Sequence, residues 1–97
     1  MKFIVSQMKK DVKEDPRAFE AMIDGSVDKE FFLTSYQEVC EIEAEDLDDV
    51  FRIGNIGPDE KIRRFDFTPM HSISVGDVIQ NEKNELYVVK GVGFERL

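Results

Sequence analysis

The last third of the chain carries the pattern that most restricts the fold. Residues 77–80 and 85–90 are β-favouring segments, and the polar residues 81–84 (Asn-Glu-Lys-Asn) separate them. Two such segments joined by a short polar turn are typical of a β-hairpin. Residues 2–8 predict a further strand. Strands that gather late in the chain, after two helical segments, predict an α+β domain.

A short helix is predicted directly after residue 15. Asp15 occupies the N-cap position, Pro16 the first helical position, and Gly25 can end the helix in a left-handed conformation. Three apolar residues within it have helical spacing and are expected to form its buried face: Phe19, Met22 and Ile23.

A second helix is predicted within an acidic segment, because carboxylates favour the positive end of a helix dipole. Its first turns are expected to contain the acidic residues Glu43, Glu45, Asp46, Asp48 and Asp49. Leu47, Val50 and Phe51 are expected to form the buried stripe, and Gly54 to end the helix. If the Phe51 ring is central to the core, Phe51→Ala costs roughly 3–5 kcal/mol.

Two more extended segments complete the predicted sheet. Residues 31–42 are rich in β-favouring side chains, but their alternation breaks around Gln37 and Glu38, which predicts a bulge there. Residues 63–67 alternate charged and aromatic side chains, as a half-buried strand does. Residues 1–97 are expected to form one α+β domain: a small, bent, mainly antiparallel sheet with two short helices. Closure of this sheet into a barrel is left open.

The charge balance restricts the partners of the chain. There are 21 acidic and 13 basic residues, which give a formal net charge of -8. This balance disfavours direct binding to nucleic-acid phosphates and to anionic membranes, since both need clustered Lys and Arg. The apolar run at the N-terminus is too short for a signal-peptide core, so we expect a cytoplasmic location.

Cys40 is the single cysteine, so no intrachain disulfide can form. Its neighbours Glu38 and Glu41 are expected to raise the pKa of its thiol and to keep it inert. One Cys and one His, about thirty residues apart, do not make a zinc site. We therefore expect neither a metal nor a cofactor.

Polar residues surround the single histidine. Five residues of this segment are expected to shape a turn: His71, Ser72, Ser74, Gly76 and Asp77. A catalytic triad is disfavoured, because side chains this close in an extended loop usually point apart and no Gly-x-Ser-x-Gly motif is present. The alternative is a small ligand-binding protein or enzyme, which predicts a pocket lined by both His71 and Asp77.

The acidic segment offers a candidate surface for a partner. Its candidate residues are Glu43, Glu45, Asp46, Asp48 and Asp49. Opposite charge favours faster encounter with a protein that has a basic surface. The alternative explanation is that these carboxylates only complement the helix dipole and solvate a helix face. No calcium-binding loop pattern is present in the segment.

The C-terminal two thirds of the chain resemble a known domain. A helix with the sequence Leu-Asp-Asp-Val-Phe-Arg-Ile-Gly-Asn (residues 47–55) precedes Ser-Ile-Ser-Val-Gly-Asp-Val-Ile (residues 72–79), the Tyr-Val-Val strand (residues 87–89) and a Gly-Phe ending (residues 93–94). In this order they resemble the YodL-like small domain of phage, plasmid and other mobile-element proteins. The resemblance covers about residues 36–97, leaves residues 1–35 as an N-terminal strand-helix extension, and implies no catalytic residues.

Together these features predict the class of function. We expect a small cytoplasmic interaction module without catalytic activity, encoded by a phage or a mobile element, that binds a protein with a basic surface. Homo-oligomerisation through sheet edges is left open. The alternative stays a small ligand-binding protein or enzyme that uses a pocket near His71.

Overall fold

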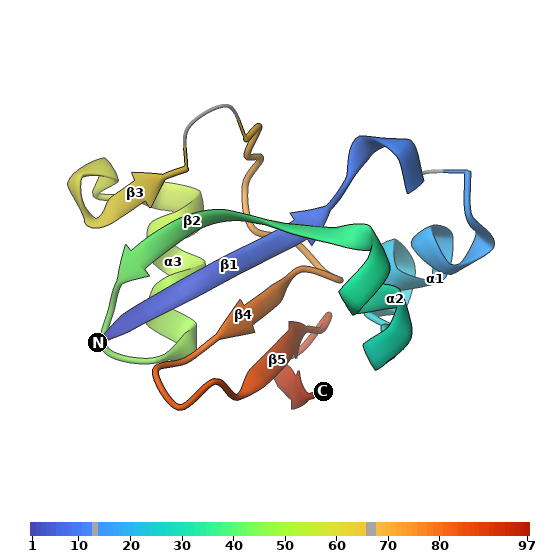
Figure 1. Ribbon diagram of the computed structural model, residues 1–97. Coiled ribbons are helices and arrows are strands. Elements are labelled where there is room, and N and C mark those ends of the chain that lie inside the picture. Colours follow the sequence, from blue (N-terminus) through green and yellow to red (C-terminus); the bar gives the residue numbers. More distant parts are fainter. Residues whose placement is uncertain (13, 66–67) are drawn as a thin grey trace.

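The computed structural model describes residues 1–12, 14–65 and 68–97, and it contains a six-stranded antiparallel sheet (Figure 1). The strands follow the order β3-β2-β1-β4-β5-β6 across the sheet. The strands are β1 (Lys2–Met8), β2 (Tyr36–Glu43), β3 (Ile62–Arg64), β4 (Val78–Gln80), β5 (Leu86–Val89) and β6 (Phe94–Arg96). The helices are α1 (Pro16–Asp24), α2 (Lys29–Ser35) and α3 (Leu47–Ile56), with short 3-10 turns η1 (Lys10–Val12) and η2 (Asp59–Lys61).

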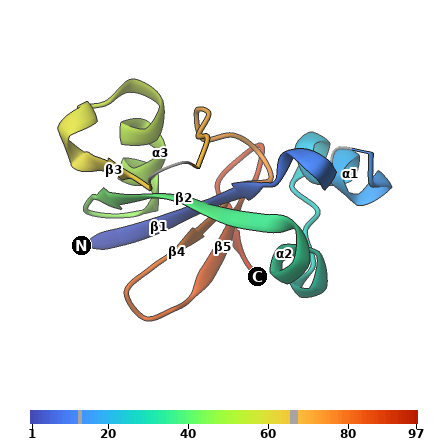
Figure 2. The same ribbon diagram turned by 45° about the horizontal axis from the view of Figure 1, so that its top comes forward.

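The predicted α+β class and antiparallel sheet are confirmed, but the number of helices differs from the prediction. The sheet is open, with β3 and β6 at its edges, so it does not close into a barrel. The described residues contain three α-helices instead of two. Figure 2 shows α3 and β3 at one end of the long β1–β2 pair, and α1 and α2 at the other end.

The centre of the sheet is the pair β1–β2, which runs in register from Lys2 opposite Glu43 to Met8 opposite Tyr36. The register shifts between Val5 and Ser6, because Val39 of β2 has no partner on β1. An extra residue of this kind is a β-bulge. The bulge lies just beyond Gln37 and Glu38, where the break in alternation predicts one.

Both faces of the sheet are covered, so buried residues alternate between two cores. One core lies under α3 and consists of Phe3, Val5, Val39, Cys40, Ile42, Ala44, Val50, Ile53, Ile73, Ile79 and Val89. The other core lies beside α1 and α2 and consists of Ala18, Ala21, Phe31, Tyr36, Val78 and Val88. Adjacent residues of β4 and β5 therefore belong to different cores.

The ends of α1 are as predicted, but its buried face is not. Asp15 accepts a hydrogen bond from the backbone N–H of Arg17, and Gly25 ends the helix with φ 76°. Ala18 and Ala21 face the core, whereas three large apolar residues are mostly exposed: Phe19 (67%), Met22 (58%) and Ile23 (66%). The face of α1 that meets the core has small residues because the helix backbone lies very close to the loop at Gly76. A Cβ added to Gly76 would lie 2.5 Å from the backbone oxygen of Ala21.

The segment predicted as extended from residue 31 begins with the helix α2, so that prediction is wrong for residues 31–35. Asp28 accepts a hydrogen bond from the N–H of Phe31 at 2.7 Å and caps the helix. The Phe31 ring is buried and meets the Tyr36 ring edge-on, with 5.8 Å between the ring centroids. Aromatic packing of this kind outweighs the β preference of the two adjacent phenylalanines.

The bounds of α3 differ from the prediction at both ends. Glu43 belongs to β2, and the helix begins at Leu47 after the N-cap Asp46. Gly54 lies within the helix, so close to Ile73 that a Cβ would be 2.3 Å from the Ile73 Cδ1, and Gly57 is the C-cap. Phe51 is 39% exposed, so its predicted burial is wrong.

The predicted hairpin forms between β4 and β5. The Asn84 N–H donates to the Asn81 carbonyl, and Asn84 has φ 64°. Residues 66 and 67 of the predicted strand 63–67 lie outside the described residues, and β3 ends at Arg64. In the part of the chain that the structure describes, no helix is long and apolar enough to cross a bilayer.

Candidate functional site

A pocket with an apolar wall lies beside His71 and has a volume of about 440 Å³. It is formed where the end of β1, the helix α1 and the loop of residues 69–77 meet. Its apolar wall consists of Met8, Ala18, Met22, Pro69, Met70 and Val75. Its polar lining consists of Gln7, Lys9, Lys10, Gln37, His71, Ser74 and Asp77. We call it the His71 pocket.

Gln7 links β1 to the loop that forms this pocket. Its side chain is only 2% exposed, and it lies on the same face of β1 as Phe3 and Val5. Its amide nitrogen donates to the His71 carbonyl at 2.9 Å and to the Asp77 Oδ2 at 3.0 Å. Its amide oxygen accepts from the His71 N–H at 3.2 Å. The Gln7 amide therefore hydrogen-bonds the backbone of His71 as a neighbouring strand would, although this loop is not part of a strand.

These contacts also orient the His71 ring. The Gln7 nitrogen has two hydrogens, and both are used by the His71 carbonyl and by Asp77. The His71 Nδ1 is 2.7 Å from the Ser72 carbonyl, which can only accept. Nδ1 therefore carries a proton and donates to the Ser72 carbonyl.

Asp77 closes the turn that precedes β4. Its Oδ2 accepts from the N–H of Ser74 at 2.9 Å, and the side chain is 2% exposed. Burial raises the pKa of Asp77 to about 6, although the hydrogen bonds from Ser74 and Gln7 and the charge of His71 act in the opposite direction. The Tyr36 hydroxyl donates to the Gly76 carbonyl within the same turn.

The five predicted turn residues lie together, but they contribute in different ways. Gly76 has φ 93° and Asp77 accepts hydrogen bonds with its carboxylate. Ser74 contributes its backbone N–H, and Ser72 contributes its carbonyl. Among the described residues, neither of these two hydroxyls hydrogen-bonds the His71 ring, and Asp77 bonds Gln7 in place of that ring.

The five residues of the predicted acidic surface are only partly brought together: Glu43, Glu45 and Asp49 line one surface pocket. Asp46 caps α3 by accepting from the Asp49 N–H at 2.8 Å. Asp49 accepts from the Glu45 N–H at 3.0 Å and pairs with Arg52, and these contacts lower its pKa. Glu43 lies on β2, 3.5 Å from the N-terminal amine. Asp48 is exposed on the first turn of α3.

Cys40 is fully buried, rather than half-buried at a strand surface. Burial raises the pKa of its thiol to about 11, with an added effect from Asp77 and an opposing one from Arg64. The direction agrees with the predicted inert thiol. The main cause is burial and not, as predicted, the charges of Glu38 and Glu41.

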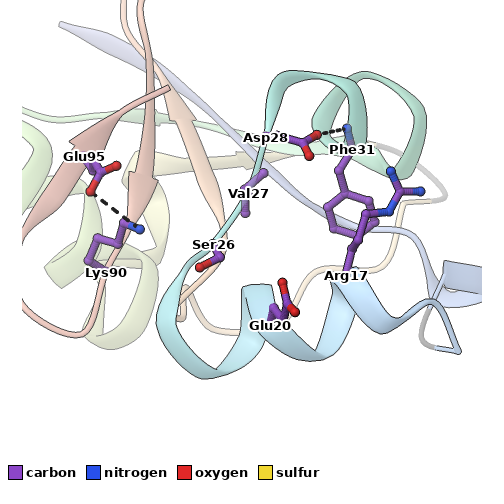
Figure 3. Close-up of a pocket in the computed structure, with 8 residues that line it drawn as sticks. All are labelled: Arg17, Glu20, Ser26, Val27, Asp28, Phe31, Lys90 and Glu95. Atoms are coloured by element: carbon purple, nitrogen blue, oxygen red, sulfur yellow. Dashed lines mark hydrogen bonds and ion pairs between the residues drawn. The ribbon is translucent and has the colours of Figure 1, made fainter.

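A second pocket of about 310 Å³ lies between α1, α2 and the end of β5 (Figure 3). Arg17 stacks over the Phe31 ring, 4.9 Å from its centroid, and pairs with Asp15 and Glu30. On the opposite wall Lys90 donates to the Gly25 carbonyl and pairs with Glu95. The cations of this pocket are thus already paired with groups of the same chain.

Comparisons with known proteins add no further assignment. No protein-family model, curated protein or solved structure matches the chain. The resemblance of residues 36–97 to the YodL-like domain therefore stays a prediction. Among the described residues, no group of three His, Cys, Asp or Glu side chains is placed to hold a metal ion.

The alternative drawn from the sequence predicts a pocket lined by both His71 and Asp77, and both residues line this one. The residues that β1 and α1 contribute to it are not predicted. Gln7 offered one signal, because it is a polar residue on the face of β1 that Phe3 and Val5 place in the core. Lys9 and Lys10 carry no local signal of a pocket, since a lysine pair at a strand end is typical of a solvated segment. Lys9 and Lys10 line one pocket with Met22 and Met70 only because distant segments of the chain come together. A local sequence pattern does not predict such contacts.

Proposed function

We propose that the protein is a binding module without catalytic activity, which holds an apolar segment of a partner protein in the His71 pocket. The observation that carries this proposal is a continuous apolar surface. Met22 lines the pocket and also belongs to the exposed face of α1 that contains Phe19 and Ile23. We call these three residues the α1 face. A partner that entered the pocket would also cover the α1 face.

The chemistry of this surface supports binding. Three methionines line the pocket, namely Met8, Met22 and Met70. Methionine side chains are flexible and polarisable, and they are common at surfaces that adapt to a partner. Large apolar residues that gather on a surface usually mark an interaction site. The base of the pocket, by contrast, is held rigidly by Gln7 and Asp77. A fixed base below an adaptable rim suits the capture of a protruding side chain.

The arrangement of polar groups argues against the alternative enzyme. Nucleophilic catalysis needs a hydrogen bond between nucleophile and base, and a second one between base and orienting carboxylate. Within the described residues, the His71 ring bonds neither Ser72 nor Ser74 through a hydroxyl, and Asp77 is directed to Gln7. These groups hold the loop in place.

The His71 pocket replaces the acidic segment as our candidate site. Asp46 and Asp49 are engaged in capping α3, so fewer carboxylates are available to a basic partner than the sequence suggests. A basic partner at Glu45 and Asp48 stays a prediction. The cytoplasmic location and the phage or mobile-element origin also stay predictions from the sequence.

The proposal is tested with a random peptide library displayed on phage. Enriched peptides are synthesised and titrated into isotope-labelled protein, and shifts of the backbone amide signals are recorded by NMR. We expect peptides with large apolar side chains, and shifts in residues 18–23 and 69–77. Met22→Glu, at an exposed position, is expected to weaken binding at least about ten-fold.

The matched control is Leu33→Glu, which places the same charge on an exposed apolar position of α2 that does not line the pocket. It should leave peptide affinity within about two-fold of the wild type. Failure to enrich any peptide, or amide shifts confined to α3, would overturn the proposal. Enrichment of basic peptides that shift α3 would favour the acidic surface instead.

A further inference from the structure

We propose that the segment held by the His71 pocket carries carboxylates next to its apolar anchor, and that these carboxylates pair with Lys9 and Lys10. This inference rests on the proposed function and specifies the chemistry of the partner. The expected partner is an acidic and apolar segment of another protein, although the chain itself has a net charge of -8.

The first observation is the position of the two lysines. Both line the same pocket as the apolar wall, at the point where β1 ends and η1 begins. The backbone N–H of Lys9 donates to the Ser35 carbonyl at 2.8 Å, so the chain is held against the end of α2 there. The backbone that carries Lys9 is therefore anchored beside the pocket.

The second observation is that these charges lack partners within the described chain. Each of the five arginines lies within 4.0 Å of a carboxylate, namely Arg17, Arg52, Arg63, Arg64 and Arg96. Neither Lys9 nor Lys10 has such a contact with any described carboxylate. Asp77 is the one carboxylate among the described residues that line the pocket, and its Oδ2 is engaged by Gln7 and Ser74.

Charge complementarity then defines the occupant. A carboxylate beside an apolar side chain would meet Lys9 and Lys10 while the side chain enters the pocket. An ion pair at the edge of an apolar pocket is less screened by solvent than one on an open surface. A protein segment fits better than a fatty acid, because Phe19 and Ile23 of the α1 face lie outside the pocket and need a larger partner to cover them.

The test uses three series of synthetic peptides of about twelve residues. All series contain the same pairs of large apolar residues, flanked by Glu in one series, Gln in the second and Lys in the third. Binding to the full chain is followed by fluorescence anisotropy at about 0.15 M salt. We expect the Glu series to bind at least about ten-fold more tightly than the Gln series, and the Lys series to bind more weakly than both.

The variant that isolates the lysines is the double substitution Lys9→Gln and Lys10→Gln. It should remove the preference for Glu and leave the affinity of the Gln series within about two-fold. The matched control is Lys29→Gln with Lys83→Gln, two exposed lysines that do not line the pocket. This control changes the net charge equally, and it should preserve the preference.

Several outcomes would overturn the inference. Equal affinities of the Glu and Gln series, with binding still lost in Met22→Glu, would overturn the acidic partner and keep the proposed function. An equal loss of preference in the control double variant would assign it to the overall charge. No binding in any series would contradict the proposed function as well. Self-association that the Lys9 and Lys10 substitutions abolish, measured by sedimentation, would assign the surface to a second copy of the chain.

Discussion

Gln7 and His71, 64 residues apart, pair through the side-chain amide of one and the backbone of the other. The Gln7 amide donates to the His71 carbonyl at 2.9 Å and accepts from the His71 N–H at 3.2 Å. β1 pairs with β4 only from Ile4 to Ser6, so Gln7 lies just beyond the last backbone pairing on that side. The side chain thus extends the hydrogen bonding of β1 to a loop that cannot form a strand.

Substitution of Gln7 by Met is expected to lower the free energy of unfolding by about 2–4 kcal/mol. The side-chain volume is nearly kept, but the buried carboxylate of Asp77 and both backbone groups of His71 lose a partner. Urea unfolding followed by far-UV circular dichroism measures the loss. Amide hydrogen exchange at His71 should become at least about ten-fold faster, because its N–H is protected through Gln7.

Gln37→Met is the matched control for this substitution. Gln37 lies opposite Gln7 in the β1–β2 register and also lines the His71 pocket, but it is only half-buried. Its side chain makes no hydrogen bond with any described residue. The control should change the unfolding free energy by less than about 1 kcal/mol. Similar losses in both variants would show that the pairing of Gln7 with His71 is not what holds the loop.

The elements of the fold that depend on local signals are predictable from the sequence. The turn at residues 81–84 and the caps Asp15 and Gly25 are recognised because each depends on the conformation of a few neighbouring residues. The helix α2 is missed because Phe31 and Phe32 favour strands, while the competing signal is a single capping carboxylate at Asp28.

Features that depend on contacts between distant segments cannot be predicted from a local sequence pattern. The spacing of Phe19, Met22 and Ile23 indicates an apolar helix face, but it does not say which face meets the sheet. The close approach of Ala21 to Gly76 decides that, and it turns the alanines inward. The parts of the His71 pocket that come from β1 and α1 are missed for the same reason. Only the polar Gln7 on a buried strand face signals that a distant polar group must pair with it.

The raised pKa of Asp77 predicts an unusual pH dependence of stability. The native carboxyl has a pKa of about 6, against its ordinary value of 3.8, so the folded state binds more protons than the unfolded state between these values. Stability from this group is therefore present below pH 4 and is lost as pH rises to about 6. The size of the effect is of the order of 2–3 kcal/mol.

Asp77→Asn removes the titrating group, and its amide oxygen can still accept from Ser74 and Gln7. The difference in unfolding free energy between this variant and the wild type should therefore shift in favour of the variant from pH 4 to pH 6. Urea unfolding at several pH values measures it. Asp24→Asn is the control, since the pKa of exposed Asp24 is lowered and its contribution is lost only at lower pH. A pH-independent difference for Asp77→Asn would contradict the expectation.

Phe51 is predicted to be central to the core, but the buried ring is that of Phe31. Phe31 is 1% exposed and packs edge-on against Tyr36, whereas Phe51 is 39% exposed. Phe31→Ala is expected to cost about 3–5 kcal/mol, because it leaves a cavity in the core beside α1 and α2. Phe51→Ala should cost less than about 1.5 kcal/mol. Thermal and urea unfolding of both variants distinguish them, and a larger loss for Phe51→Ala would mean that α3 is rotated from its position here.

The junction of α1 with the His71 loop depends on the absence of a side chain at Gly76. This residue has φ 93°, and a Cβ would lie 2.5 Å from the backbone oxygen of Ala21, which cannot move without shifting α1. Gly76→Ala is expected to lower the unfolding free energy by about 3 kcal/mol or more, since strain and steric overlap add. Gly91→Ala is the control, because no atom lies within 4 Å of the added methyl group. It should stay within about 0.5 kcal/mol of the wild type in thermal unfolding, and equal stability of the two variants would contradict the close contact between α1 and the loop.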